Sequence, residues 1–337
     1  MKDIAQDLGV SVITVSKALR DVSDISEETR DRVLKRSREL GYQPNLAARS
    51  LVTGRTQLIG VVVPDLVHAF FGEVAKGLSR ELHPHGYSLV ICSSEEDPNR
   101  EREQIERLLA QQVDALILAS ADSSEVNLRQ IAQYNTPHLL IDRRWTGSEA
   151  HFVGVDDELA GTMAVEHLIA QERRRIAHIR GLKTSTALGR LKGYRRALSA
   201  HGLAMPEKYV VAGKAADDAA EASGHAAMQE LLLVSPRPDA VFCYNDPIAL
   251  GAMRAILEAD LRIPNDIAIV GCGNVTYAGL LRVPLTSVDQ QTNELGRRTA
   301  QQILKLIESE TPIPPEAVLL EPRLVVRESS DISKASS

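Results

Sequence analysis

Residues 7–22 read DLGVSVITVSKALRDV and place a glycine between two segments that are each too short to fold alone. The flanking residues 3–8 and 12–20 have the pattern of short helices, and Ser11 is a suitable N-cap for the second one. A helix-turn-helix needs a small residue where its helices touch, a glycine in the turn and a buried branched residue in the second helix. The chain meets these needs in order with Ala5, Gly9 and Val15. On spacing alone, the pattern predicts either this unit or an αα-corner that only packs.

The segment that follows favours the helix-turn-helix. A third helix is expected to open at Ser26, with acidic residues in its first turn, and to end at Gly41. Up to Thr56 the chain has ten Lys and Arg against eight Asp and Glu, whereas the remainder has 29 against 37. A basic head on an acidic body is typical of a protein with an anionic partner at one end. The third helix contributes five cations, Arg30, Arg32, Lys35, Arg36 and Arg38, and its apolar face is expected at Val33, Ser37 and Leu40.

Composition narrows the class of protein. The chain has 337 residues, 44% of them hydrophobic and 25% charged, which is typical of a globular protein with two or more domains. It contains no run of about 18 apolar residues, and its first residues, MKDIAQDLG, carry acids where a signal peptide needs a basic and then an apolar stretch. We therefore expect a cytoplasmic protein with no membrane contact.

Metal, cofactor and catalytic signatures are missing from the sequence. Cys92, Cys243 and Cys272 each lie inside an apolar run, which favours buried thiols over a disulfide framework or a metal knuckle. No GxGxxG follows the first apolar run, and neither GxxxxGK[ST] nor GxSxG occurs. We expect no metal, no cofactor and no enzymatic activity.

From Leu58 onward, apolar runs alternate with amphipathic stretches. Short continuous apolar runs separated by helices are typical of parallel strands that are covered on both faces. The fold class predicted here is an α/β sandwich with two similar lobes and a ligand cleft at the carboxyl ends of the strands. The predicted strands are 58–64, 88–93, 115–120, 138–142, 152–156, 175–181, 240–246 and 267–273, and PRLVVRE (322–328) is also strand-like.

At this point the sequence resembles the lactose/galactose-repressor family of bacterial transcriptional regulators. The resemblance begins with DIAQDLGVSVITVSKAL (3–19), VSDISEETRDRV (22–33) and ELGYQPNLAARSL (39–51). It continues to the end of the chain through VVPDLVHAFF, VDALIL, LLIDR, VGVDDELAG, GRLKGYRRAL, FCYNDPIALGAMRA, IPNDIAIVG, PLTSVDQ and PRLVVRES. The resemblance implies a helix-turn-helix head, a hinge helix and a periplasmic-binding-protein-like (type I) body that binds an effector and dimerises. The implied boundaries are 1–44, 45–57 and 58–330, with a disordered tail at 331–337.

In that family the second helix enters the major groove of DNA. The resemblance implies that Lys17 donates to guanine O6 or N7, and that Val12 and Ile13 pack on thymine methyl groups. The alternative for Val12 and Ile13 is a place in the helix-packing core. Hydroxyl and amide side chains are implied to contact phosphates, although Ser11 and Ser26 also suit helix capping. The implied DNA-binding residues are Ser11, Val12, Ile13, Thr14, Ser16, Lys17, Ser26, Thr29, Asn45, Ala48 and Leu51.

The stretch NLAARSLVTG (45–54) matches the hinge helix of the family. So short a helix is unstable without packing, so we expect it to order on DNA. Leu51 lies where the family has its minor-groove wedge, and two such wedges bend the duplex across a two-fold axis. The alternative for Leu51 is packing between domains. The implied partner is a palindromic double-stranded operator bound by a homodimer, since no apolar heptad helix that would favour a tetramer follows PRLVVRE.

The resemblance also implies which residues line the effector cleft. The aromatic, guanidinium, amide and carboxylate groups among them suit a small polyhydroxylated or anionic ligand. Phe70 and Phe71 have an alternative place in the core, and Asp142 could cap a turn instead. The implied effector-binding residues are His68, Phe70, Phe71, Asp142, Arg190, Asn245, Asn274 and Gln290.

The chain departs from the family at Cys272-Gly273-Asn274, where relatives commonly have an aromatic residue followed by an effector-binding Asp. Without that carboxylate, an ordinary hexose is less expected, and Asn274 or another group is expected to compensate. The loop predicted at 213–224 is also longer than usual in the family and lacks its frequent aromatic residue.

The sequence therefore predicts a transcriptional repressor whose affinity for its operator is controlled by a small molecule, such as a sugar or sugar derivative. As a regulator it would work in the cytoplasm, associated with the nucleoid. A solute-binding protein without a DNA role is the main alternative, but it would require export. An α/β enzyme is the other alternative.

Overall fold

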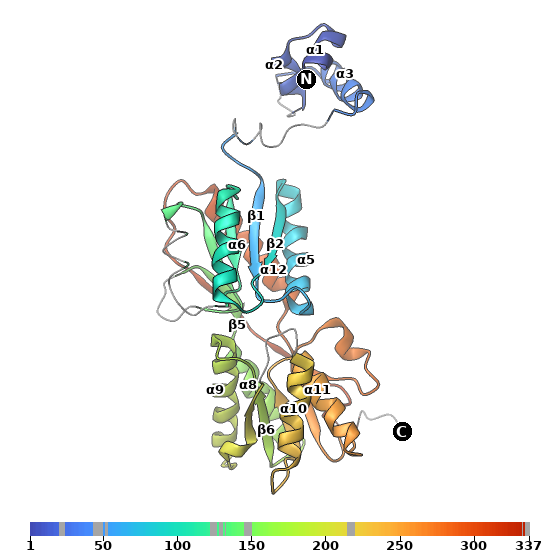
Figure 1. Ribbon diagram of the computed structural model, residues 1–337, viewed down its shortest axis with the longest axis vertical. Coiled ribbons are helices and arrows are strands. Elements are labelled where there is room, and N and C mark those ends of the chain that lie inside the picture. The colour runs from blue at the N-terminus through green and yellow to red at the C-terminus, as the bar shows by residue number, and fades with distance from the viewer. Residues whose placement is uncertain are drawn as a thin grey trace. The chain divides into compact units, whose positions relative to one another are not determined.

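The computed structural model describes residues 1–19, 24–42, 50, 53–121, 127, 131, 133–144, 150–213, 220–331 and 333. The chain divides into two units, Met1–Thr56 and Gln57–Ser337, and each is described by itself (Figure 1). In the described part, no helix is long and apolar enough to cross a membrane.

The helices of the first unit are α1 (Lys2–Leu8), α2 (Val12–Leu19) and α3 (Glu27–Glu39). Gly9 ends α1 with a φ of 64°, in the left-handed region that glycine adopts without strain. Ala5 and Val15 are buried where α1, α2 and α3 meet, together with Ile4, Ala18 and Val33. The three sequence positions that predicted the motif therefore perform the packing tasks assigned to them.

Serine hydroxyl groups cap the N-termini of α2 and α3. Ser11 Oγ accepts the backbone N–H of Thr14 at 3.0 Å, and Ser26 Oγ accepts that of Thr29 at 3.3 Å. Both bonds satisfy a donor that has no partner within the helix, so the expectation that these serines act as caps is confirmed. Leu40, which was expected on the apolar face of α3, is instead exposed after the end of the helix.

The second unit contains two six-stranded sheets. The first has the order β11 (Ala317–Leu320), β5 (Phe152–Val155), β4 (His138–Ile141), β3 (Ala115–Leu118), β1 (Leu58–Val63), β2 (Ser88–Ser93). The second has the order β12 (Arg323–Val325), β10 (Thr286–Asp289), β9 (Ala268–Gly273), β8 (Ala240–Cys243), β6 (Ile176–Arg180), β7 (Val210–Ala212). Neighbouring strands pair in parallel except β10 and β12, which are antiparallel.

Helices cover both faces of each sheet, and the central strands are buried as a result (Figure 1). On the first sheet, α5 (Ala69–Leu82) and α12 (Thr292–Glu308) pack on one face and α6 (Pro98–Ala110) on the other. On the second, α8 (Asp157–Ala170) and α9 (Ser185–Ala200) oppose α10 (Ala220–Leu232) and α11 (Asp246–Glu258). Short 3-10 turns are η1 (His83–His85), η2 (Glu207–Tyr209) and η4 (Thr276–Gly279). The predicted α/β sandwich with two lobes is confirmed.

The eight main predicted strands all form, and so does a shortened one in 322–328. The sequence analysis missed β7, β10 and β11. β7 and β11 are apolar but short, with three and four residues, and β10 begins with the polar residues Thr286 and Ser287, which are buried. Two further expectations need correction, since Cys92 is only half-buried and residues 220–224 of the predicted loop belong to α10.

The chain passes between the two sheets after β5, after β10 and between β11 and β12. These passages connect the lobes near the carboxyl ends of β5 and β10. Loops that follow the strands of both sheets therefore lie between the lobes, which is where a ligand site is expected in such folds.

Helices α10 and α11 touch backbone to backbone at Gly251. A Cβ there would collide with the carbonyl oxygen of Glu221 and lie 2.6 Å from the backbone nitrogen of His225. We predict that Gly251→Ala lowers the free energy of unfolding by about 1–3 kcal/mol, because rigid backbone has to move. Gly72→Ala in α5 is the matched control. Its Cβ meets no atom within 4 Å, so a gain of up to about 1 kcal/mol is expected. Urea unfolding followed by circular dichroism would measure both, and equal stability of the two variants would contradict the prediction.

Candidate functional site

The outer face of α2 is apolar and exposed. Val12 is 42% exposed and Ile13 is 68% exposed, whereas Val15 and Ala18 face the core. The alternative that Val12 and Ile13 belong to the packing core is therefore wrong. Exposed branched side chains on a short helix are suited to apolar contact with a partner, such as the methyl groups of thymine.

Polar groups surround this face. Lys17 is the charged residue of α2, and its ammonium forms an ion pair with the carboxylate of Asp24. The side-chain hydroxyls of Ser11 and Thr14 lie 2.9 Å apart at the start of α2, and Ser26 and Thr29 form the same pair at the start of α3. Ser16 is half-buried on α2. Asn45, Ala48 and Leu51 lie outside the described residues.

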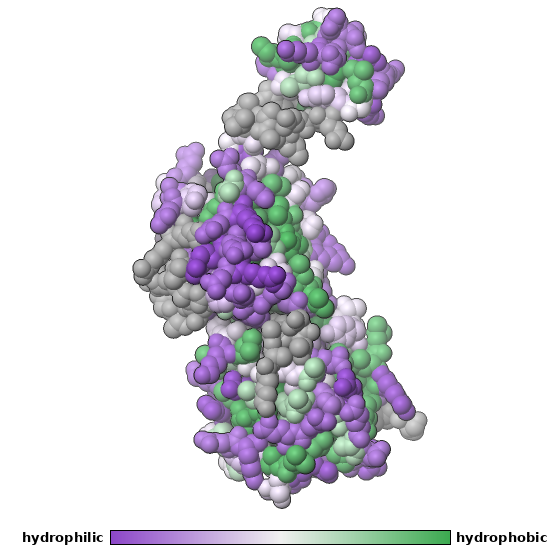
Figure 2. Space-filling view, viewed as in Figure 1, coloured by the Kyte–Doolittle hydropathy of each residue, from purple (hydrophilic) through white to green (hydrophobic). Residues whose placement is uncertain are grey.

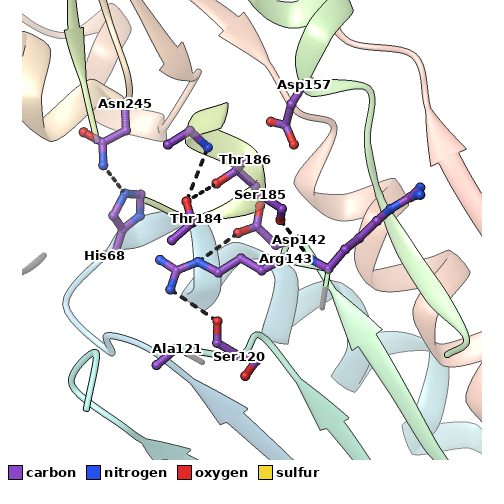
Figure 3. A network of polar contacts seen from close by, with 12 residues as sticks. His68, Ser120, Ala121, Asp142, Arg143, Asp157, Thr184, Ser185, Thr186 and Asn245 are labelled. Atoms are coloured by element: carbon purple, nitrogen blue, oxygen red, sulfur yellow. Dashed lines mark hydrogen bonds and ion pairs between the residues drawn. The ribbon is translucent and has the colours of Figure 1, made fainter. Parts of the chain in front are cut away.

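A cavity between the lobes of the second unit collects residues from strand ends of both sheets (Figure 3). The cavity is small in this structure: its volume is about 20 Å³, room for about one water molecule. It is lined by His68, Phe70, Phe71, Asp142, Arg143, Arg190, Tyr244, Asn245 and Gln290. Seven of the eight residues that the sequence suggested for the effector cleft are thus brought together, and Arg143 and Tyr244 join them.

Asn274 lies elsewhere. It lines a separate polar hollow beside α5 and the start of α12, and its Oδ1 accepts a hydrogen bond from Arg327 at 2.7 Å. Its own N–H donates to Ser287 Oγ at 2.9 Å. The side chain is therefore already used within its lobe and does not supply a polar group to the cavity that contains Asp142.

The two guanidinium groups of the cavity are both matched by carboxylates. Arg143 donates twice to Glu96, at 2.6 Å each, and Arg190 donates to Asp157 at 2.9 Å. Burial lowers the pKa of Arg143, but the hydrogen bonds that Arg143 donates to Glu96 and its electrostatic attraction to Tyr244, Glu96 and Asp142 together raise it overall. Burial raises the pKa of Asp157, and the charge of Arg190 counteracts that effect.

Asp142 supplies the remaining carboxylate. It follows β4 with a φ of 60°, a conformation that Asp tolerates better than most residues, and its Oδ2 lies 3.8 Å from Arg143 Nε. Burial raises the pKa of Asp142, while the charges of Arg143 and Arg190 lower it. Since the guanidinium groups are bound to Glu96 and Asp157, Asp142 is the cavity carboxylate best able to accept hydrogen bonds from a ligand.

Aromatic rings and amides complete the lining. Phe70 and Phe71 meet edge to face with ring centroids 5.1 Å apart, and both also belong to the core of the first lobe. His68 Nε2 lies 3.3 Å from Asn245 Nδ2, across the two lobes (Figure 3). Burial lowers the pKa of His68 to about 4, so its ring is uncharged at neutral pH. Asn245 caps α11 by accepting the N–H of Ile248 at 2.9 Å, which fixes its amide at the cavity wall.

Tyr244 and Arg143 were missed by the sequence analysis although each directly adjoins a residue that it selected. Tyr244 lies with its ring 4.7 Å from the Arg190 guanidinium, and its carbonyl accepts Arg190 Nη1 at 2.7 Å. Asp142 was selected by its place in a family motif, whereas Glu96 after β2 and Asp157 after β5 were not selected although they also follow strands. Within the described ranges, no group of three or more His, Cys, Asp and Glu side chains is placed to hold a metal ion.

An N-terminal helix-turn-helix unit followed by a two-lobed α/β body with a polar cavity defines a DNA-binding regulator with a periplasmic-binding-like body. Two family descriptions match the chain, "Bacterial regulatory proteins, lacI family" at residues 1–45 and "Periplasmic binding protein-like domain" at residues 165–330. The ribose operon repressor of Escherichia coli (strain K12) is 33% identical over 332 residues, covering 98% of this chain and 99% of that one. The chain therefore belongs to the lacI family and is a DNA-binding transcriptional regulator.

Solved structures agree over nearly the whole chain. The lac repressor dimer bound to operator has a TM-score of 0.85 and 27% identity, covering 97% of this chain and 98% of that one. The CelR–cellobiose complex has a TM-score of 0.75 and 31% identity, with the same coverage. Relatives that are repressors confirm the expectation that this chain is a regulator and not an enzyme.

We predict that Arg190→Met lowers the free energy of unfolding by about 3–5 kcal/mol, because it leaves the Asp157 carboxylate buried without its cation. The double variant Arg190→Met with Asp157→Asn should regain most of the loss. Arg196→Met is the control on the same helix, since Arg196 pairs with Glu158 at the surface and its loss should cost less than about 1 kcal/mol. Urea unfolding at neutral pH measures all three variants. Equal losses for Arg190→Met and Arg196→Met would contradict the prediction.

Proposed function

We propose that the protein represses transcription from a palindromic operator and that an uncharged sugar or sugar derivative, bound between the lobes, controls its affinity for DNA. The observation that carries the proposal is the cavity in which His68, Asp142, Arg190, Asn245 and other polar groups from both lobes converge. A ligand that binds there changes the equilibrium between lobe arrangements by the difference in its affinity for them.

The charges of the cavity support a neutral ligand. Arg143 and Arg190 are paired with Glu96 and Asp157, so an anionic ligand would have to displace a buried carboxylate. Asp142 accepts hydroxyl hydrogens, the amide of Asn245 donates and accepts, and Phe70 and Phe71 offer apolar ring faces. That combination suits a polyhydroxylated ring, and it is compatible with the cellobiose present in the CelR structure.

A thermal-shift panel tests this proposal. Ribose, xylose, glucose, galactose and cellobiose would be compared with ribose 5-phosphate, glucose 6-phosphate and gluconate. We expect stabilisation by at least one neutral sugar, of about 2.7 kcal/mol at 100 times its Kd, and a matching change in DNA affinity. Asp142→Asn should abolish the shift, whereas Asp289→Asn, which makes the same charge change in the separate hollow, should retain it. Stabilisation by anionic compounds alone would contradict the neutral class.

We also propose that the working form is a homodimer, with a head at 1–44, a hinge at 45–57 and a body at 58–330. Its site of action is the cytoplasm, at the nucleoid. Each head would bind one half of the operator, with Ser11, Val12, Ile13, Thr14, Ser16, Lys17, Ser26, Thr29 and Asn45 as contacts. Ala48 and Leu51 of the two hinges would meet in the minor groove, where the leucines unstack a base step.

Exposed apolar side chains support a second copy as the partner. In the first lobe, Leu66 and Val67 are 56% and 85% exposed and Ile91 on the edge strand β2 is 39% exposed; in the second lobe, Leu280 is 81% exposed. Figure 2 shows apolar surface over β2 and α5. An edge strand and apolar loops of this kind are stabilised when another chain covers them.

We predict that Val67→Glu shifts the protein from dimer to monomer, because a carboxylate would be buried at the interface, and weakens operator binding at least tenfold. Leu233→Glu is the control, since Leu233 is 88% exposed at the end of α10 and should leave the dimer intact. Sedimentation equilibrium measures the state of association. A wild-type monomer, or a dimer unaffected by Val67→Glu, would exclude this surface.

A further inference from the structure

Lys17 provides the charge of the helix expected to enter the major groove. The eight residues of α2 read VITVSKAL, and the exposed face they present is otherwise apolar and hydroxylic. The attraction of this helix to DNA phosphates therefore depends on whether the ammonium of Lys17 is available.

In the first unit that ammonium is paired with Asp24, which lies in the turn before the Ser26 cap of α3. Both side chains are partly exposed, at 37% and 51%, and exposed pairs contribute little to folding. The first unit has few residues and two net positive charges, so an acid beside the reading helix reduces its general affinity for DNA. The pair is thus better explained by recognition than by stability.

We propose that Asp24 is a specificity-determining residue, whose carboxylate holds the Lys17 ammonium and makes contact with bare phosphates unfavourable relative to contact with the correct base pair. The inference rests on the DNA-binding function and deepens it. A phosphate must compete with the Asp24 carboxylate for the ammonium. A G·C pair offers both partners, since guanine O6 and N7 accept from Lys17 while the cytosine amino group donates to Asp24. The ion pair between Lys17 and Asp24 would remain intact on the correct base pair and would be disrupted at other DNA sites.

The test compares wild type with Asp24→Asn as full-length chains on two duplexes, a random 30-base-pair sequence and the best sequence recovered from selection with wild type. Asn keeps the shape of the side chain and removes its charge. We expect Asp24→Asn to bind the random duplex about 3- to 10-fold more tightly near 0.1 M salt, with the slope of log K against log salt steeper by about one. The ratio of specific to nonspecific affinity should fall.

Two comparisons separate this mechanism from a simple gain of charge. Asp31→Asn makes the same charge change at an exposed position of α3 and should alter affinity for the random duplex less than Asp24→Asn. In a Lys17→Gln background, Asp24→Asn should change that affinity less than twofold, because the ammonium that it releases is absent.

Each outcome decides the proposal. Equal effects of Asp24→Asn with and without Lys17 would show that Asp24 repels phosphates by itself and would overturn it, as would unchanged or weaker nonspecific binding. Failure of wild type to bind either duplex would overturn the DNA-binding function and the inference together. The inference would be supported if Asp24→Asn raises affinity for the random duplex only when Lys17 is present. That result would not depend on whether an effector is found.

Discussion

Parallel pairing places the carboxyl ends of the strands at one edge of each sheet, and the passages of the chain between the sheets bring these two edges together. Asp142 follows β4, Tyr244 and Asn245 follow β8, and Gln290 follows β10. Helices cover both faces of each sheet, because parallel strands are apolar along their length and have to be buried. Only the ends of the strands are then free to supply polar side chains to the cavity. Much of the chemistry of the body depends on this arrangement.

Close helix packing then refines the positions of the charged groups. Gly161 on α8 leaves room for the backbone at Arg190 on α9, where any Cβ would collide with the carbonyl oxygen of Arg190. This contact helps to place the guanidinium beside Asp157 at the start of α8 and under the ring of Tyr244. Since a buried guanidinium is stable only with its carboxylate in place, the pair defines which polar groups remain for a ligand. The cavity is therefore polar but offers few uncompensated charges.

The head is much smaller than the body. Its small core of Ile4, Ala5, Val15, Ala18 and Val33 holds α2 in position, and capping hydroxyls begin two of its helices. On its outer side, α2 presents an apolar face and one paired ammonium. In such a head, base contacts carry more of the affinity relative to phosphate contacts than they do in a strongly basic one.

The sequence by itself determined the fold class, the caps of the head and the main strands, and its resemblance to the lactose/galactose-repressor family indicated most of the residues that line the cavity. The fold class, caps and strands are local features, since apolar runs and the spacing of Ala5, Gly9 and Val15 are visible within a few positions of each other. It failed for β7, β10 and β11, which are short, polar at the start or half-exposed, and for Asn274, which was expected to replace the carboxylate missing at Gly273 but lies in a separate hollow.

The tertiary structure alone decided which side chains pair with one another and which stay exposed. It bound Asn274 to Arg327, 53 positions away in the chain, matched Arg143 with Glu96, and left Val12 and Ile13 exposed. It also paired Lys17 with Asp24. Charge pairing and exposure depend on which groups meet in space, and a hydrogen bond acts over about 3 Å whatever the separation in sequence. For that reason the sequence identified the chemical groups of both sites, while the folded chain determined which of them remain available to a ligand or to DNA.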